Sequence, residues 1–142
     1  MRNGFTLVDL LLALVIAAVV LAIALPRVHD MRDRLLVNQA AWEIVAAHTR
    51  ARAMAMVEGR VAVLTVGPDS LLLGVVDGID TLPRWAGTGP SGAGVQLAGG
   101  KRQIAFAPMG LSFGLSNTTF TVSRGAATRQ VVVSRYGRVR VQ

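Results

Sequence analysis

The chain has 142 residues, the usual size of a single domain, and a formal net charge of +7. It contains no cysteine, so a disulfide framework, a thiolate metal site and a cysteine nucleophile are excluded. Hydrophobic residues make up 52% of the chain, but they are concentrated at its amino-terminal end, so that roughly 115 residues of ordinary composition remain for a modest core.

The first predicted element is an apolar run from Phe5 to Leu25. As an α-helix, such a run would measure about 32 Å, which matches the hydrocarbon core of a bilayer. Pro26 is expected to end the run, because proline lacks the amide donor and crowds the preceding turn. The pattern therefore predicts a transmembrane helix, while basic residues on both of its sides leave the orientation open.

A secretory signal peptide is the main alternative for this segment. Ala22-Ile23-Ala24 has the small-x-small pattern of a cleavage site, and cleavage there would release a soluble protein that begins at Leu25. The basic region before the run is a single arginine, the run is long, and Pro26 is badly placed next to such a site. An acid at position 9, Asp9, also has no use in a signal peptide.

The first nine residues combine features that are specific when they occur together. A short leader ends in Gly4, Phe5-Thr-Leu follows, and Asp9 stands at the fifth place after that glycine, before a long apolar run and a proline. This start is similar to that of type IV prepilins and type II secretion pseudopilins. The resemblance implies that a prepilin peptidase cuts between Gly4 and Phe5 on the cytoplasmic side and methylates the new amino group of Phe5.

The resemblance also implies a division of the chain and a location. Residues 1–4 would be a leader peptide, residues 5–26 a transmembrane and assembly helix, and residues 27–142 a periplasmic globular domain. The protein would cross the inner membrane once, with its amino terminus in the cytoplasm, and would enter a pilus or pseudopilus after assembly.

Asp9 has a physical role under this interpretation. An unpaired carboxylate costs roughly 2.5–3.5 kcal/mol at the centre of a membrane helix, and less near the interface. Cleavage would create an amino group at Phe5, one helical turn away, and in a filament the amino group of a neighbouring subunit would meet Asp9. We therefore expect Asp9 to favour assembly. The family usually has glutamate there, whose longer side chain reaches further, so weaker assembly or a special filament position is expected.

The rest of the chain predicts one more helical segment followed by strands. Residues 27–58 are expected to continue the helix, because apolar residues recur at steps of three and four and Gly59 is a good stop. Residues 77–100 are rich in glycine, proline and serine, have no period, and are predicted to be a long loop. Within the β-rich part, residues 60–142, strands are predicted at Arg60–Val66, Ser70–Val76, Arg102–Ala107, Leu111–Phe113, Thr119–Arg124, Gln130–Ser134 and Arg138–Val141.

The predicted fold class is therefore α+β, with a long amino-terminal helix packed on a mostly antiparallel sheet. This agrees with the pilin resemblance. The second half of the chain also resembles the GspH/FimT subgroup, in the segment "IAFAPMGLSFG" at 104–114 and in the carboxy-terminal "VVVSRYGRVRVQ".

One motif and two histidines are the candidate ligand sites. Residues 87–92 fit the dinucleotide fingerprint G-x-G-x-x-G, but Pro90 removes an amide and more glycine follows instead of a helix, so a flexible loop is predicted. His29 and His48 have no companion ligand, and each is interpreted as a surface or interface residue. Catalytic motifs are absent from the sequence. We therefore expect no enzyme activity, no cofactor and no metal site.

The carboxy-terminal arginines are the candidate nucleic-acid contacts. All acids of the chain lie at or before Asp80, so the rest of the chain is purely basic and suggests an anionic partner. On a strand, Arg138 and Arg140 would point to one face, and Arg135 would join them across a turn at Gly137. Such a row suits successive phosphates. FimT-like pilins implicated in DNA uptake carry a glycine-arginine-x-arginine motif, and Gly137-Arg138-Val139-Arg140 matches it. The alternative to DNA contact is that these arginines only form a solvated strand face.

Together these features predict a minor pilin or pseudopilin, a structural subunit of a type II secretion pseudopilus or a type IV pilus. Its expected partners are other pilin subunits, the prepilin peptidase and the inner membrane. The alternative is a DNA-binding minor pilin for DNA uptake, and a released soluble protein is a third interpretation. The sequence does not separate the secretion system from the pilus.

Overall fold

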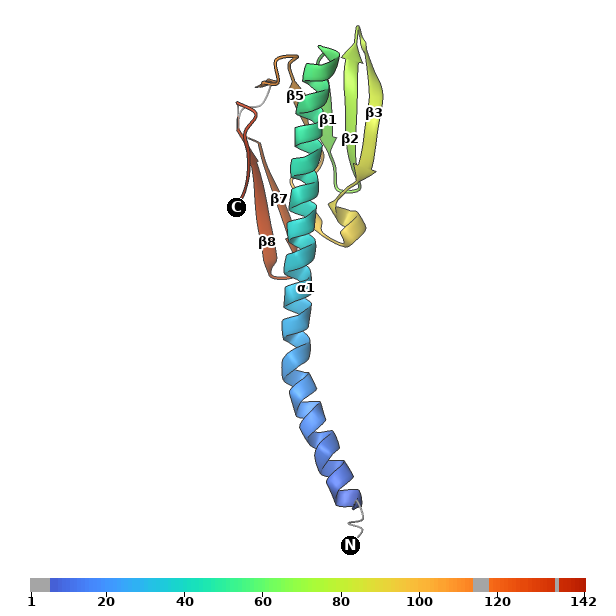
Figure 1. Cartoon of the computed structure of the whole chain (residues 1–142), viewed down its shortest axis with the longest axis vertical. Coiled ribbons are helices and arrows are strands. Elements are labelled where there is room, and N and C mark those ends of the chain that lie inside the picture. Colours follow the sequence, from blue (N-terminus) through green and yellow to red (C-terminus); the bar gives the residue numbers. More distant parts are fainter. Residues whose placement is uncertain (1–5, 114–117, 135) are drawn as a thin grey trace. The chain divides into compact units, whose positions relative to one another are not determined.

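The computed structural model describes residues 6–113, 118–134 and 136–142. The first element is one long helix, α1 (Leu7–Glu58), and all the described strands follow it in the sequence (Figure 1). The chain divides into two compact units, Met1–Arg32 and Asp33–Gln142, and α1 contributes to both.

In the amino-terminal unit, α1 is apolar and uncovered. Every side chain from Thr6 to Arg32 is exposed, and by length and composition this part of α1 can cross a membrane. The prediction that residues 27–58 continue the helix is confirmed, because α1 passes through Pro26 without a break. A proline removes one backbone hydrogen bond, and the good helix-forming sequence on both of its sides maintains the helix.

In the second unit, α1 buries one face against the sheets. The buried positions recur at steps of three and four, as the sequence predicts for an amphipathic helix. Most of them are alanines, which let the strands approach the helix axis closely. They are Val37, Ala40, Ala41, Ile44, Ala47, His48, Ala51 and Ala55.

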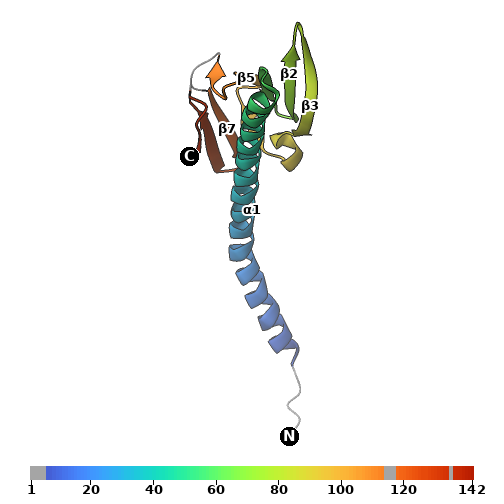
Figure 2. The same cartoon turned by 45° about the horizontal axis from the view of Figure 1, so that its top comes forward.

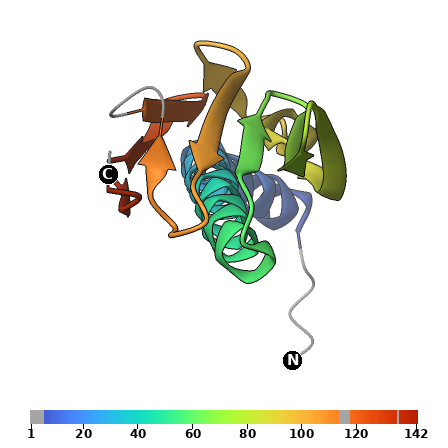
Figure 3. The same cartoon turned by 90° about the horizontal axis from the view of Figure 1, so that it is seen from above.

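The described strands form two antiparallel sheets. The first has the order β3-β2-β1-β5-β6 and consists of β1 (Ala62–Val66), β2 (Ser70–Asp77), β3 (Asp80–Thr88), β5 (Arg102–Phe106) and β6 (Ser112–Phe113). The second has the order β4-β7-β8-β9 and consists of β4 (Gln96–Ala98), β7 (Thr118–Arg124), β8 (Ala127–Val133) and β9 (Val139–Val141). Viewed along α1, the strands lie in an arc around it (Figure 3). Phe106 and Phe120 are the largest fully buried side chains of the core that α1 and the two sheets share.

The prediction of a long loop over residues 77–100 was wrong. This segment forms β3, a short 3₁₀ helix η1 (Pro90–Ala93) and β4. β3 forms the hairpin with β2 that Figure 2 shows, and it is the end strand of its sheet. Most side chains of β3 are exposed, so its sequence does not alternate between apolar and polar residues. As the end strand of its sheet, β3 also tolerates Pro83, which has no amide to donate.

A register shift in this hairpin has a structural use. Leu73 pairs with Trp85 and Gly74 with Pro83, so Arg84 is the extra residue of a β-bulge. Arg84 donates to both carboxylate oxygens of Glu58, at 3.0 and 3.1 Å. The bulge thus ties the end strand to the last residue of α1.

The remaining predicted strands are confirmed with shifts at their ends. The largest shift concerns β8, which begins at Ala127 and not at Gln130. Arg124 pairs with Ala127, so the turn contains only Gly125 and Ala126, and Gly125 has the positive φ of 55° that such a tight hairpin requires.

Candidate functional site

Asp9 lies in the first turn of α1 and caps that helix. The Thr6 hydroxyl donates to Oδ2 of Asp9 at 2.6 Å, and the Thr6 backbone N–H donates to the same oxygen at 3.1 Å. In return the Asp9 N–H donates to the Thr6 hydroxyl at 3.3 Å. This is a capping box, which satisfies backbone donors that the first turn leaves unpaired. The capping box was not predicted from the sequence, although the spacing T-x-x-D was its signal.

The remaining residues of the proposed processing site are not placed. Gly4 and Phe5 lie outside the described residues. Pairing between Asp9 and a Phe5 amino group therefore stays a prediction. Within the described range, Oδ1 of Asp9 accepts no hydrogen bond, so one carboxylate oxygen remains open to a further donor.

The two described carboxy-terminal arginines lie on one side of the chain end. Arg138 precedes β9 and Arg140 is in its middle, and both are exposed, whereas Val139 and Val141 are partly buried against the core. Arg135 lies outside the described residues, so its place beside them is not tested.

Gly137 of the glycine-arginine-x-arginine motif has a purely structural reason to be glycine. Its φ is +71°, and an added Cβ would lie 3.2 Å from the carbonyl oxygen of Gly110. Its N–H donates to the Ser134 carbonyl at 2.9 Å, and the Ser134 N–H donates to the Arg138 carbonyl at 2.8 Å. The turn before β9 therefore packs closely on the turn before β6, and this packing fixes the backbone at the start of the segment that carries the two arginines.

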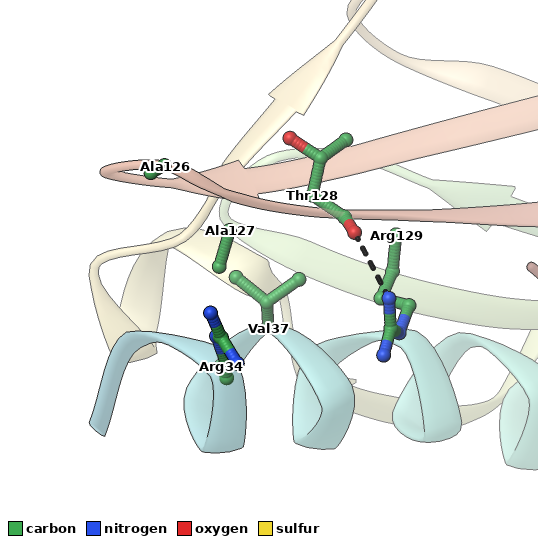
Figure 4. Close-up of a pocket in the computed structure, with 6 residues that line it drawn as sticks. All are labelled: Arg34, Val37, Ala126, Ala127, Thr128 and Arg129. Atoms are coloured by element: carbon green, nitrogen blue, oxygen red, sulfur yellow. Dashed lines mark hydrogen bonds between the residues drawn. The ribbon is translucent and has the colours of Figure 1, made fainter. Parts of the chain in front are cut away.

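Other basic residues of the carboxy-terminal half have structural partners. Arg124 pairs with Asp33 at 2.7 Å and also donates to the Ala93 carbonyl. Arg129 donates to Asn38 at 2.8 Å. It also lines a hollow of about 240 Å³ between α1 and the β7–β8 turn, where Figure 4 shows its bond to the Thr128 carbonyl. By contrast, the side chains of Lys101, Arg138 and Arg140 form no ion pair or hydrogen bond with the part of the chain that the structure describes.

Arg138 and Arg140 line a second hollow of about 270 Å³, which we call the basic hollow. Its walls are His48, Thr49 and Arg52 from α1 and the segment Gly137–Arg140. No acidic side chain is among these lining residues. The hollow is therefore a concave, positively charged site between the helix and the carboxy-terminal strand.

His48 lines this hollow and is only 2% exposed. Its ring meets the ring of Phe106 edge-on, with 5.0 Å between centroids. Burial, and then the charge of Arg52, lower the pKa of His48 to about 4, so the imidazole is neutral at neutral pH. The interpretation of His48 as a surface or interface residue was wrong. Its position four residues after Ile44, on the buried stripe, was the signal that it belongs to the core.

The glycine-rich segment 87–92 is ordered and does not form a phosphate cradle. The N–H of Gly89 donates to the Asp69 carbonyl at 3.0 Å, and that of Ser91 donates to the Pro68 carbonyl at 2.9 Å. An added Cβ at Gly89 would clash with the Pro68 carbonyl. Gly89 thus serves close packing on the β1–β2 turn, and the prediction of a flexible loop was wrong, because the segment forms the end of β3 and most of η1.

Comparisons with known proteins agree on one family. Residues 40–137 match the family described as type II transport protein GspH. The pilin-like protein PilA1 of Thermus thermophilus is 33% identical over 157 residues, and the alignment covers 99% of each chain.

Two crystal structures of the type IV minor pilin FimU of Pseudomonas aeruginosa share the fold. One superposes with a TM-score of 0.64 at 19% identity and covers 77% of this chain and 90% of FimU. The other gives a TM-score of 0.60 at 18% identity, with 74% and 91% covered.

Proposed function

The chain belongs to the GspH family of type IV pilin-like proteins, and from this premise we propose that it is processed between Gly4 and Phe5 and assembled into a filament through α1. As a minor pilin or pseudopilin it is a structural protein and not an enzyme. Its family implies assembly with other pilins.

The observation that carries the assembly proposal is the uncovered apolar half of α1. Leucines, valines and isoleucines from Leu7 to Leu25 are all more than half exposed. In water such a surface is strongly unfavourable, at about 25 cal/mol for each Å² of apolar area. Before assembly, we propose, lipid of the inner membrane covers it, with the amino terminus in the cytoplasm and residues 27–142 in the periplasm. After assembly, the helices of neighbouring pilins cover it.

Asp9 would act at the step between membrane and filament. Its Oδ2 is occupied by Thr6, whereas Oδ1 is open within the described residues. An incoming amino group, exposed at Phe5 of a neighbouring subunit by cleavage, would bond to Oδ1 without breaking the cap. A cation next to this carboxylate is worth more in lipid than in water, because the low dielectric strengthens the interaction.

Incorporation of variants into filaments tests this proposal. Asp9→Ala should insert in the membrane and be cut normally, yet be several-fold depleted from sheared filaments relative to the membrane fraction. Thr6→Ala removes the cap and keeps the carboxylate, so it is the matched control and should be incorporated nearly as well as the natural protein. Equal incorporation of Asp9→Ala and Thr6→Ala would contradict a role for the charge in assembly.

A second candidate function is DNA binding by a minor pilin for DNA uptake. The observation that favours it is the pair Arg138 and Arg140, which are exposed and without acidic partners among the residues that the structure describes. If they bind phosphates, the full-length protein in detergent should bind duplex DNA less tightly as salt rises.

The double variant Arg138→Ala, Arg140→Ala should then lose about tenfold or more in DNA affinity. Its control is Arg34→Ala, Lys101→Ala, which removes the same charge from two other exposed positions. If both double variants weaken binding equally, the effect is one of net charge and the carboxy-terminal arginines are no DNA site.

A further inference from the structure

The tip of the β2–β3 hairpin carries an isoleucine that its own chain leaves uncovered. Asp77 pairs with Asp80, so the turn consists of Gly78 and Ile79, and Gly78 has the positive φ of 65° that a tight hairpin turn requires. Ile79 is fully exposed, and the hairpin extends past the end of α1 (Figures 1 and 2). A branched apolar side chain is unusual at such a place, because turns favour glycine, asparagine, aspartate and serine.

The two acids that flank this turn differ in their partners. Asp77 forms an ion pair with Arg60 at 3.0 Å. Asp80 is exposed, and its carboxylate forms no ion pair or hydrogen bond with the residues that the structure describes. The tip therefore presents one apolar side chain next to one free carboxylate. We call Ile79 and Asp80 the hairpin knob.

A hollow of about 570 Å³ lies on the face of the first sheet that points away from α1, and we call it the sheet hollow. On β1 and β2, Leu64 and Leu73 are buried in the core with α1, so the alternation of side chains places Thr65 and Leu72 on the opposite face. Leu72 is 40% exposed there. The volume is in the range of concave sites that hold a bound group.

The sheet hollow offers mainly apolar surface and one unpaired cation. Nε2 of Gln103 donates to the Thr65 hydroxyl at 3.2 Å, so two of its polar groups satisfy each other. Arg84 is already paired with Glu58. The remaining charge is Lys101, whose ammonium group has no partner in the described parts of the chain, and no acidic side chain is among the described lining residues. The occupant that suits this hollow is therefore an apolar group with a carboxylate beside it.

We propose that the sheet hollow receives the hairpin knob of a second copy of this chain, with Ile79 in the hollow and Asp80 paired with Lys101. The knob cannot enter the hollow of its own chain, because Leu72 and Asp77 are five residues apart on β2, or about 17 Å. The contact joins two different surfaces, and every copy carries both of them. It involves no part of the amino-terminal unit, so it goes beyond the filament role proposed above.

Disulfide trapping tests this contact, because the natural chain has no cysteine. Full-length Ile79→Cys and Leu72→Cys proteins with different tags are mixed in detergent micelles and oxidised. A disulfide requires Cα atoms about 4.4–6.8 Å apart, so a mixed dimer forms readily only where the two positions meet. We expect several times more mixed dimer than from the control pair Ala126→Cys and Leu72→Cys. Ala126 is an exposed residue of the β7–β8 hairpin turn and matches Ile79 in its setting.

Exchange of the two charges tests the proposed ion pair. Asp80→Lys in the Ile79→Cys protein should lower the yield of mixed dimer about fivefold or more, because it places two cations together. Lys101→Asp in the Leu72→Cys protein should have the same effect when it is present alone. With both changes the pair is restored with its signs reversed, and the yield should recover. The same exchange should leave the low yield of the Ala126→Cys control pair unchanged.

Cross-linking in native membranes tests whether the partner is a second copy. A photo-reactive phenylalanine derivative in place of Leu72 should become joined to the peptide that contains Ile79, which mass spectrometry identifies. Equal yields from the knob and the control pair, or no recovery after charge exchange, would overturn the proposal. So would a photo-product with a different protein alone. None of these results bears on cleavage at Gly4 or on filament incorporation, so the filament role is tested separately.

Discussion

The two halves of α1 differ both in sequence and in surroundings, since the first is almost entirely apolar and the second is amphipathic. From Leu7 to Arg32 every side chain is exposed, whereas beyond Asp33 one stripe of the same helix is covered by two sheets of its own chain. Each half also contains a polar side chain in an apolar setting. Asp9 is half satisfied by Thr6, and His48 has no partner within the described residues. The second half is therefore stabilised by the fold of its own chain, whereas no described part of the chain covers the apolar surface of the first half.

Matched isoleucines in the two halves give the largest expected contrast. Ile44 is fully buried and Ile16 is exposed. Ile44→Ala should lower the free energy of unfolding by about 2–5 kcal/mol, since it removes buried methyl groups and leaves a cavity. Ile16→Ala should change it by less than about 0.5 kcal/mol. Urea titration of the full chain in detergent, followed by tryptophan fluorescence, measures both; equal effects would contradict the division of α1.

His48 should make the second half sensitive to acid. Its pKa is about 4 in the folded chain and near 6.5 when unfolded, so below pH 6.5 the unfolded chain binds the proton first. Stability is therefore full above pH 6.5, and about 3 kcal/mol is lost by pH 4, below which this histidine adds no further loss.

Comparing the natural chain with His48→Leu isolates this contribution from that of the carboxylates. His48→Leu fills a similar volume and leaves no unpaired nitrogen, so it should be at least as stable at neutral pH and lose less on acidification. Urea titrations at pH 7 and pH 4 provide the measurement. Parallel losses in both proteins would mean that His48 is not the acid-sensitive group.

Two ion pairs of the second unit should differ in strength. Arg124 and Asp33 are mostly covered, whereas Arg60 and Asp77 are about half exposed. Arg124→Ala should cost about 2 kcal/mol, because it leaves the Asp33 carboxylate and the Ala93 carbonyl poorly solvated. Arg60→Ala should cost about 0–1 kcal/mol. Thermal unfolding of both variants tests the difference. A larger loss of stability from Arg60→Ala than from Arg124→Ala would contradict this ranking of the two ion pairs.

The smallest expected effect concerns the cap in the first half. Thr6→Ala removes the hydroxyl that bonds Asp9 and should loosen the first turn of α1 by about 1 kcal/mol. Thr6→Ser keeps a hydroxyl and should preserve the cap. Amide hydrogen exchange at the start of α1 in detergent reports the change, and equal protection in the two variants would show that the capping box contributes little.

The apolar period predicted α1 well and most strands to within a few residues, because burial on one face leaves a regular pattern in the sequence. β3 escaped prediction because an end strand with exposed side chains leaves no such pattern, and Pro83 argued against it. Arg138 and Arg140 were found from their motif. The hollow that His48 and Arg52 line was not predicted, because it forms only where β9 and the turn at Gly110 approach that part of the helix.

The most direct test of the filament role is the amino terminus of the protein purified from its native membranes and filaments. Intact mass and amino-terminal sequencing should give a chain that begins at Phe5 and carries an added methyl group. That chain would have the free amine which Asp9 of a neighbour requires. A chain that begins at Met1, or one released at Leu25, would lack this amine and would contradict assembly through the first half of α1.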